Sequence, residues 1–260
     1  MHPIVFTFHG LTIYTYGLCM AAGLLIGLYV ALRESPRQGI QSRDVSDIFF
    51  WGILSGLVGA RLLYVIVEWG YFLRHPARIF FAREGFVFFG GFISAFCVVS
   101  LFVKGHRLPF WTVADILAPS IAVAHAVGRL GCFFYGCCYG CPTDRWYGMI
   151  FPSESPVIYA GQKVIPTQLI ESAALFCIFG ILLLRRTRRR FSGELFALYL
   201  MLYGISRFLI EFLRGDPRGA VWILSHSHVF PISQVLAFTA ALLGLFLFLF
   251  LSSKSPGHLS

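Results

Sequence analysis

The residues most able to do chemistry are charged side chains within long apolar stretches, where a charge persists only if it faces a cavity or a partner. They are Arg61, Arg129, Arg207, Asp115, Glu171 and Glu211. A single arginine–carboxylate pair would be a structural link, but three arginines against few acids predict a site for an anion that the protein does not itself supply. The planar guanidinium suits phosphate because it donates two parallel, charge-assisted hydrogen bonds.

The densest group of such residues is the segment HAVGRLGCFFYGCCYGCPTD, residues 125–144. His125 lies four residues before Arg129, so both side chains share one face of a helix. Glycines recur through the segment, and backbone without Cβ atoms can approach a ligand closely. These glycines are Gly128, Gly131, Gly136 and Gly140.

Four of the seven cysteines also occur in this segment: Cys132, Cys137, Cys138 and Cys141. One CxxC without a second matched pair is a weak zinc pattern, so we expect no metal and no other cofactor. A disulfide in an oxidising compartment and a cysteine nucleophile both remain compatible with the spacing. The other cysteines are expected to be small apolar core residues. They are Cys19, Cys97 and Cys177.

A second polar group follows one helical face, because Tyr203, Arg207 and Glu211 are spaced by four residues. Such a stripe on an otherwise lipid-like helix must face the interior of a helix bundle. An ion pair between Arg207 and Glu211 within the same helix accounts for the presence of Glu211 equally well. Around Arg61, small residues allow two helices to approach closely, which explains the glycines there but not the arginine.

The composition places these residues in a membrane protein. Of 260 residues, 57% are hydrophobic and only 13% are charged, which excludes a soluble globular domain, a disordered chain, a coiled coil and a secreted disulfide scaffold. The formal net charge is +9, and in a membrane protein such an excess indicates topology and anionic lipid rather than nucleic acid.

We expect an all-α polytopic protein with seven transmembrane helices in one domain, residues 1–260. The helices are expected at 11–32, 45–67, 86–103, 111–134, 167–184, 193–213 and 231–251. One set of loops carries 11 basic residues and the opposite set carries 7, so the N-terminus should lie outside and the C-terminus in the cytoplasm. The proline-rich segment 135–166 is expected to be an ordered outward-facing lid. Residues 75–85 are either a short interfacial helix or a plain connector.

Several motifs, in order along nearly the whole chain, resemble those of one known family. GRLGCFFYGCCYG at 128–140 resembles the signature of the prolipoprotein diacylglyceryl transferases, Gly-Arg-x-Gly-Asn-Phe-x-Asn-Gly-Glu-x-x-Gly. The other matching pieces are YTYGLCMAAG at 14–23, GARLLYV at 59–65, FFGG at 88–91, PTQLIES at 166–172, YGISRFLIEFLR at 203–214 and ISQ at 232–234.

This resemblance implies transfer of a diacylglyceryl group from phosphatidylglycerol to the lipobox cysteine thiol of a prolipoprotein signal peptide, in the bacterial inner (cytoplasmic) membrane. It implies no nucleic acid as partner. By position, Arg129 is expected to hold the lipid headgroup and Arg207 is the second essential arginine, with Tyr16 also catalytic. The substrate-binding positions carried over are Arg61, Tyr203, Glu211, Gly90, Gly91, Cys132 and Gly140.

The sequence also departs from the family pattern. The family's common His-Gly-Gly, whose histidine has been proposed as base, reads Phe89-Gly90-Gly91 here, and Cys132 and Cys137 replace the signature Asn and Glu. Ile165 stands where a histidine is often found. We hypothesise that His125 does part of the missing work, because it alone among the eight histidines lies deep in an apolar helix. The alternative is a core histidine bonded to Asp115 or to backbone.

Other function classes also fit part of the pattern. A family paralogue could use a different acceptor. An anion transporter would use membrane arginines and interrupted helices, although the sequence shows no inverted repeat. A thiol-redox membrane protein would use the clustered cysteines.

Overall fold

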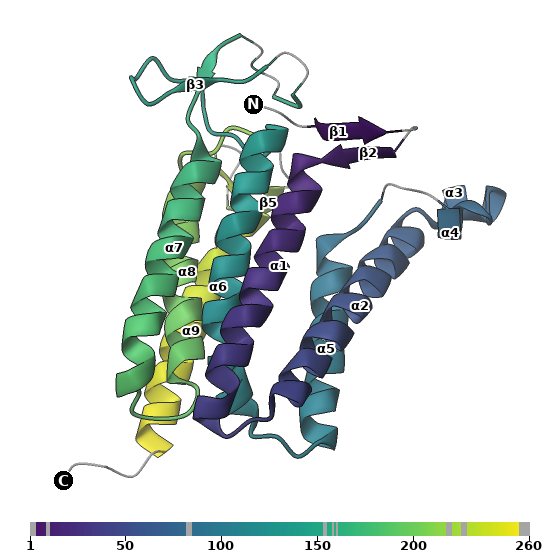
Figure 1. Cartoon of the computed structure of the whole chain (residues 1–260). Coiled ribbons are helices and arrows are strands. Elements are labelled where there is room, and N and C mark those ends of the chain that lie inside the picture. The colour runs from purple at the N-terminus through teal and green to yellow at the C-terminus, as the bar shows by residue number, and fades with distance from the viewer. Residues whose placement is uncertain are drawn as a thin grey trace. The chain divides into compact units, whose positions relative to one another are not determined.

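The computed structural model describes residues 4–8, 11–81, 85–152, 155–157, 159, 161–216, 220–224 and 228–254. The chain forms two compact units, one of Met1–Ala31 with Ala114–Ser260 and one of Leu32–Val113. Helices make up most of both units (Figure 1).

The first unit contains most of five long helices. They are α1 (Thr15–Glu34), α6 (Phe110–Tyr135), α7 (Thr167–Arg185), α8 (Glu194–Glu211) and α9 (Ile232–Lys254), with the 3-10 turn η2 (Arg186–Arg188) after α7. The second unit contains η1 (Ser35–Gln38), α2 (Ser42–Val67), α3 (Trp69–Arg74), α4 (Arg78–Phe81) and α5 (Phe88–Gly105). The long helices lie at all seven predicted places, with ends shifted by a few residues.

Three antiparallel pairs of short strands accompany the helices in the described part of the chain. They are β1 (Ile4–Phe8) with β2 (Leu11–Tyr14), β3 (Met149–Ile150) with β4 (Lys163–Val164), and β5 (Ala220–Leu224) with β6 (His228–Pro231). The prediction that the first helix begins at residue 11 is therefore wrong. Residues 11–14 are rich in β-branched and aromatic side chains, and they pair with the similar run at 4–8 instead of starting the helix.

Six of the described helices are long and apolar enough to cross a membrane, counting α1 with η1 and α7 with η2. These are α1, α2, α5, α6, α7 and α9. Helix α8 is not among them, because its 18 residues include the charged Glu194, Arg207 and Glu211.

Helices α6, α7 and α8 pack around one apolar core in the first unit (Figure 1). Its buried residues are Ala118, Ala122, Ile178, Leu182, Leu195 and Tyr199. Helix α1 approaches α6 closely, because a Cβ atom at Gly23 would lie 2.7 Å from the Ala124 carbonyl oxygen. Small residues at helix contacts are the usual means of packing helices within a bilayer.

The carboxylate of Asp115 on α6 caps the start of α8. It accepts hydrogen bonds from the backbone N–H groups of Gly193 (2.7 Å) and Phe196 (3.0 Å), and it pairs with Arg189 at 3.2 Å. Helix N-termini leave unpaired N–H groups and a partial positive charge, and a carboxylate satisfies both. Asp115 is fully buried, so this contact fixes the register of α8 on α6. It does not bond to His125, which excludes one alternative from the sequence.

The segment predicted as a lid, 135–166, has an ordered core of its own. Tyr139, Phe151, Val157 and Val164 are buried against one another, and β3 pairs with β4. In the region 75–85, one turn of helix, α4, occupies Arg78–Phe81, and residues 82–84 lie outside the described part of the chain.

Candidate active site

Glu171, in the first turns of α7, is the centre of a buried charge cluster. Its Oε1 lies 2.9 Å from Nη2 of Arg129 and 3.8 Å from Nε of Arg207, and its Oε2 lies 3.8 Å from Nη1 of Arg214. Nε2 of His125 lies 4.0 Å from the same Oε1. One carboxylate therefore collects arginines from α6, from α8 and from the segment after α8.

Two of these arginines have a further acidic partner. Arg207 pairs with Glu211 at 2.7 Å, one turn along α8, and Ser233 at the start of α9 donates its hydroxyl to Glu211 at 2.7 Å. Arg214 donates from Nε and Nη2 to the two oxygens of Asp216, at 3.0 and 2.9 Å. Three arginines thus face three carboxylates, and the predicted excess of arginine is wrong for this cluster. The sequence count missed Asp216 because it lies beyond the apolar stretch.

Arg129 nevertheless keeps an unused donor. Its Nε is buried and has no hydrogen-bond partner among the described residues. A buried donor without a partner carries a penalty of about 1–3 kcal/mol, more when it is charged. This nitrogen is therefore a point where an anionic oxygen would bind favourably.

The predicted Tyr203, Arg207 and Glu211 stripe does face the bundle interior at its charged end, since Arg207 and Glu211 are 8% and 7% exposed. The ring of Tyr203 contacts the ring of His125, with centroids 5.3 Å apart, and its hydroxyl interacts electrostatically with Arg129. The structure thus brings four predicted site residues together with Arg129.

Tyr16 lies beside the end of α6. Its ring packs against Tyr135 with centroids 6.2 Å apart, and a Cβ atom at Gly131 would lie 3.3 Å from its Cδ2. Electrostatic interaction links its hydroxyl to Arg129 and to the neighbouring cysteines. It therefore belongs to the surroundings of the charge cluster.

The start of α7 holds the chain that follows α6. Thr167 donates its hydroxyl to the Cys138 carbonyl at 2.8 Å, and buried Gln168 donates its amide to the Cys137 carbonyl at 2.6 Å. One turn later, Ser172 bonds the Ala126 carbonyl of α6 at 2.9 Å. The PTQLIES segment is thus the element that fixes the cysteine turn and the arginines relative to each other.

Gly140 and Arg214 face each other in an isolated antiparallel bridge. A Cβ atom at Gly140 would lie 2.6 Å from the Leu213 carbonyl oxygen and 2.6 Å from the Ile165 Cβ atom. Only glycine permits this approach, which brings the segment after α8 against the end of the signature motif. Burial opposes the charge of Arg214, but hydrogen bonds to Asp216 and electrostatic attraction to Cys138 outweigh it and raise the arginine's pKa.

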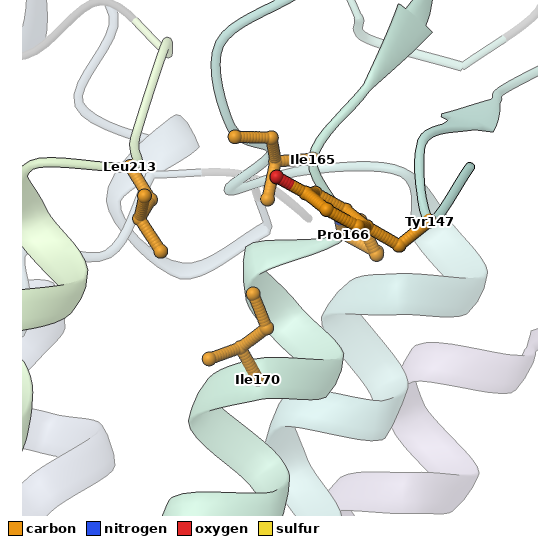
Figure 2. Close-up of a pocket in the computed structure, with 5 residues that line it drawn as sticks. All are labelled: Tyr147, Ile165, Pro166, Ile170 and Leu213. Carbon is orange, nitrogen blue, oxygen red and sulfur yellow. The ribbon is translucent and has the colours of Figure 1, made fainter. Parts of the chain in front are cut away.

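An apolar pocket of about 270 Å³ lies at the start of α7 (Figure 2). Its lining residues are Tyr147, Ile165, Pro166, Ile170 and Leu213. Leu213 precedes Arg214 and Ile170 precedes Glu171 in sequence, so the pocket and the cluster share the same two segments.

Arg61, Gly90 and Gly91 lie in the second unit. The Arg61 guanidinium donates to the carbonyls of Ile79, Gly85 and Arg78, at 3.1, 3.1 and 2.7 Å. A Cβ atom at Gly90 would lie 2.4 Å from the Gly59 carbonyl oxygen. Within this unit, Arg61 holds the backbone of Arg78, Ile79 and Gly85, and Gly90 permits close packing of α5 on α2.

All seven cysteines are free thiols. Cys132, Cys137 and Cys138 are partly buried, whereas Cys97 and Cys177 are exposed. The expectation that the last two are core residues is wrong, because they lie on the outer faces of α5 and α7, where an apolar thiol can face lipid.

Sequence reasoning named Glu171 only as a charged residue in the membrane, and it ended the predicted helix 193–213 just before Arg214. A signal for Arg214 was present, because Arg207, Glu211 and Arg214 follow an i, i+4, i+7 pattern on one helical face. No local pattern gave the central role of Glu171, since its partners come from two other parts of the chain.

A sequence model of the prolipoprotein diacylglyceryl transferase family matches residues 3–250. The chain is similar to the phosphatidylglycerol–prolipoprotein diacylglyceryl transferase of Clostridium tetani, with 34% identity over 248 residues, which cover 95% of this chain and 97% of that protein. It is 32% identical to the transferase of Clostridioides difficile over 261 residues, 100% of this chain and 99% of the relative. These matches cover both described units, and the chain belongs to the prolipoprotein diacylglyceryl transferase family.

Proposed function

We propose that this chain transfers the diacylglyceryl group of phosphatidylglycerol to the lipobox cysteine thiol of prolipoproteins, the first step of lipoprotein maturation. The observation that carries this assignment is the buried cluster of Arg129, Arg207 and Arg214 around Glu171, in a chain of this family. The unpartnered Nε of Arg129 supplies a donor for the lipid phosphate. A transporter or a thiol-redox protein is not favoured by the family assignment.

In this reaction the acceptor thiolate attacks the glyceryl carbon that carries the phosphate. A carbon–sulfur bond forms, the carbon–oxygen bond to phosphate breaks, and its electron pair leaves with glycerol phosphate. In this proposal, Arg129 and Arg207 are the preorganised donors that stabilise negative charge on the leaving oxygen. Glu171 and Glu211 hold the two guanidinium groups in position.

The surrounding residues have supporting roles in this proposal. Tyr16, Tyr203 and Gly140 shape the headgroup site beside Arg129. The pocket in Figure 2 suits a hydrocarbon part of a substrate, because its lining residues are apolar. Arg61, Gly90 and Gly91, in the second unit, are proposed as substrate-binding residues from the family resemblance alone.

The proposed setting is the bacterial inner membrane, with the chain acting as one transferase domain. Helix α8 would be the seventh span, because its charged residues face partners in the bundle instead of lipid. The excess of basic residues in one set of loops supports an orientation with the N-terminus outside and the C-terminus in the cytoplasm. Residues 135–166 would then form a lid at the outer surface.

The test is direct. Purified protein is incubated with phosphatidylglycerol and a lipobox peptide, and mass spectrometry measures addition of the diacylglyceryl mass to the cysteine. A peptide with serine at that position is the matched control. Transfer to the cysteine peptide alone supports the proposal. The proposal would be refuted if the purified protein transfers no diacylglyceryl group and the gene also fails to restore growth to a strain depleted of its own transferase.

A further inference from the structure

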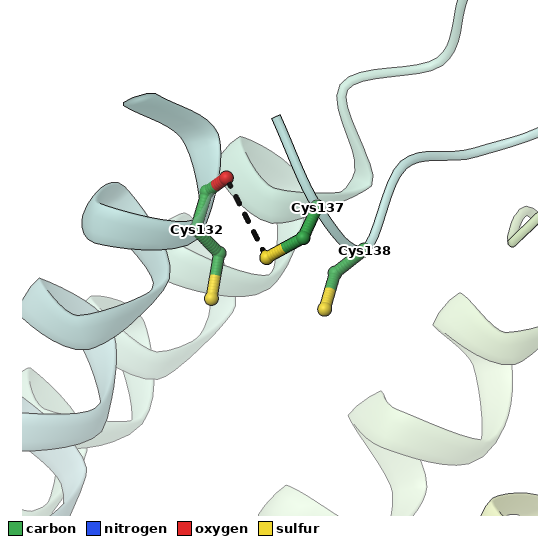
Figure 3. Close-up of side chains that lie close together, drawn as sticks. All are labelled: Cys132, Cys137 and Cys138. Atoms are coloured by element: carbon green, nitrogen blue, oxygen red, sulfur yellow. Dashed lines mark hydrogen bonds between the residues drawn. The ribbon is translucent and has the colours of Figure 1, made fainter. Parts of the chain in front are cut away.

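The cysteine turn between α6 and α7 brings three thiols together. The Sγ atoms of Cys132, Cys137 and Cys138 all lie within 4.8 Å of one another. Figure 3 shows Cys132 on the last turns of α6 and the other two on the segment that follows. The Cys137 thiol also donates to the Cys132 carbonyl at 3.9 Å.

The backbone adopts an unusual conformation to achieve this. Cys138 has a φ of +62° and Gly136 a φ of +85°. A left-handed conformation is natural for glycine, but it is strained for cysteine by about 1–3 kcal/mol. Thr167 and Gln168 hold the carbonyls of Cys138 and Cys137 in this arrangement. A strained backbone that its neighbours hold in place in this way indicates a functional constraint at this turn.

Two guanidinium groups lie near the same three thiols. The guanidinium of Arg214 interacts electrostatically with Cys138, and that of Arg129 interacts with Cys132 and Cys138. Three thiolates and one divalent cation would carry a net charge of minus one, beside guanidinium groups that also pair with Glu171 and Asp216. No fourth His, Cys, Asp or Glu of the described residues joins the group, and Cys141 instead donates to the Arg214 carbonyl at 3.2 Å.

We propose that Cys132, Cys137 and Cys138 bind one thiophilic divalent ion of the Zn²⁺ class, and that its open fourth position binds the acceptor thiol. This reverses the expectation from sequence, in which one CxxC pair was too weak a zinc pattern. Three protein ligands with one open position are typical of catalytic zinc sites, whereas structural sites use four. The inference rests on the proposed function, because it assigns the acceptor of that reaction to the metal.

A metal-bound acceptor thiol would explain how the thiol loses its proton although Phe89 stands where the family commonly has a histidine. A thiol that coordinates zinc loses its proton, which passes to water. The bound thiolate then forms the carbon–sulfur bond as the carbon–oxygen bond to phosphate breaks, and no histidine base on α5 is required. The ion is unchanged by the step, so no oxidant or reductant is needed.

Metal binding is tested separately from activity. Protein purified under reducing conditions is stripped of metal and titrated with Zn²⁺ and with Co²⁺, and thiolate-to-cobalt charge-transfer absorption reports the ligands. We expect one ion per chain, with affinity lowered at least about 100-fold in Cys132→Ser and in Cys138→Ser. Cys97→Ser and Cys177→Ser are the matched controls and should bind like the parent. Equal binding by all variants, or a Cys132–Cys137 disulfide in reduced preparations, would overturn the proposal.

Thiol activation is tested by the pH profile of the metal-free and zinc-loaded protein. An unbound cysteine thiol has a pKa of about 8.5, so metal-free transfer should fall about tenfold per pH unit below that value. Zinc-loaded transfer should stay nearly flat between about pH 6 and pH 8. Identical profiles would refute the role of the ion even if it binds. If the protein binds metal but no preparation transfers the diacylglyceryl group, the proposed function is refuted instead.

Discussion

Replacement of Arg129 by lysine tests whether the guanidinium holds the phosphate by its fork rather than by charge alone. The lysine keeps a positive charge beside Glu171 but loses the unpartnered Nε and the second parallel donor. Removing one preorganised donor of a developing oxyanion costs about 2.7–4 kcal/mol, or about 10²–10³ in rate. We therefore expect kcat/KM for phosphatidylglycerol to fall by that factor in Arg129→Lys, and by at least as much in Arg129→Ala.

Folding must be separated from chemistry in this experiment. Loss of one partner from a buried ion pair destabilises a protein by about 3–5 kcal/mol, although Glu171 would keep Arg207 and Arg214 at 3.8 Å. The double variant Arg129→Gln with Glu171→Gln removes both charges, so it should regain stability while remaining inactive. Arg188→Lys, at an exposed position of η2, is the control for the substitution itself.

The assay is mass-spectrometric transfer to the lipobox peptide, with phosphatidylglycerol varied in detergent at matched protein concentration. Thermal unfolding of each variant is measured in parallel. Arg129→Ala that keeps more than about a tenth of the parent activity would refute phosphate binding by this residue. Recovery of activity in the double variant would also refute it, because Arg129 would then act only by neutralising Glu171.

Three further predictions concern other contacts. Asp115→Ala leaves Arg189 and two N–H groups at the start of α8 without their acceptor. The free energy of unfolding should therefore fall by about 3–5 kcal/mol. A fall of less than about 1 kcal/mol in denaturant unfolding would contradict capping of α8 by Asp115. His125→Gln and His125→Phe, beside Glu171, should each lower transfer by about 10²-fold if the histidine is catalytic, and activity within a few-fold of the parent would dispose of that role. Gly59→Ala places a Cβ atom 1.9 Å from the Ser94 hydroxyl and should lower the free energy of unfolding by about 1–3 kcal/mol. Gly70→Ala is the control, because its Cβ atom meets no atom within 4 Å. Equal melting temperatures of the two variants would refute close packing of α2 on α5.

The helices were predictable from sequence because a bilayer sets both their length and their composition. A span needs about 20 apolar residues, so α2 and α6 show plainly as long apolar runs with charged ends. The hairpin before α1 was not predicted, because its apolar residues continue directly into the helix and length alone cannot separate the two. Pairing of 4–8 with 11–14 depends on cross-strand contacts.

Within the site, sequence reasoning succeeded where one helix supplies both partners. His125 with Arg129, and Arg207 with Glu211, follow from the four-residue period of a helix, and both pairs lie in the cluster. It failed where partners come from different elements. Asp115 was an open candidate partner for His125, but its carboxylate caps α8, 78 residues away along the chain.

The sequence by itself determined the family, the apolar helices and the arginines that a membrane protein keeps only for a reason. Those properties are local, since they depend on residue type and on spacing along one segment. Only the tertiary structure decided that Glu171 joins three arginines, that Arg214 belongs to the site, and that the three sulfurs of Cys132, Cys137 and Cys138 converge. These contacts depend on how α7 packs against α6 and on a left-handed turn at Cys138, and packing between distant segments is not encoded in any single stretch of the chain.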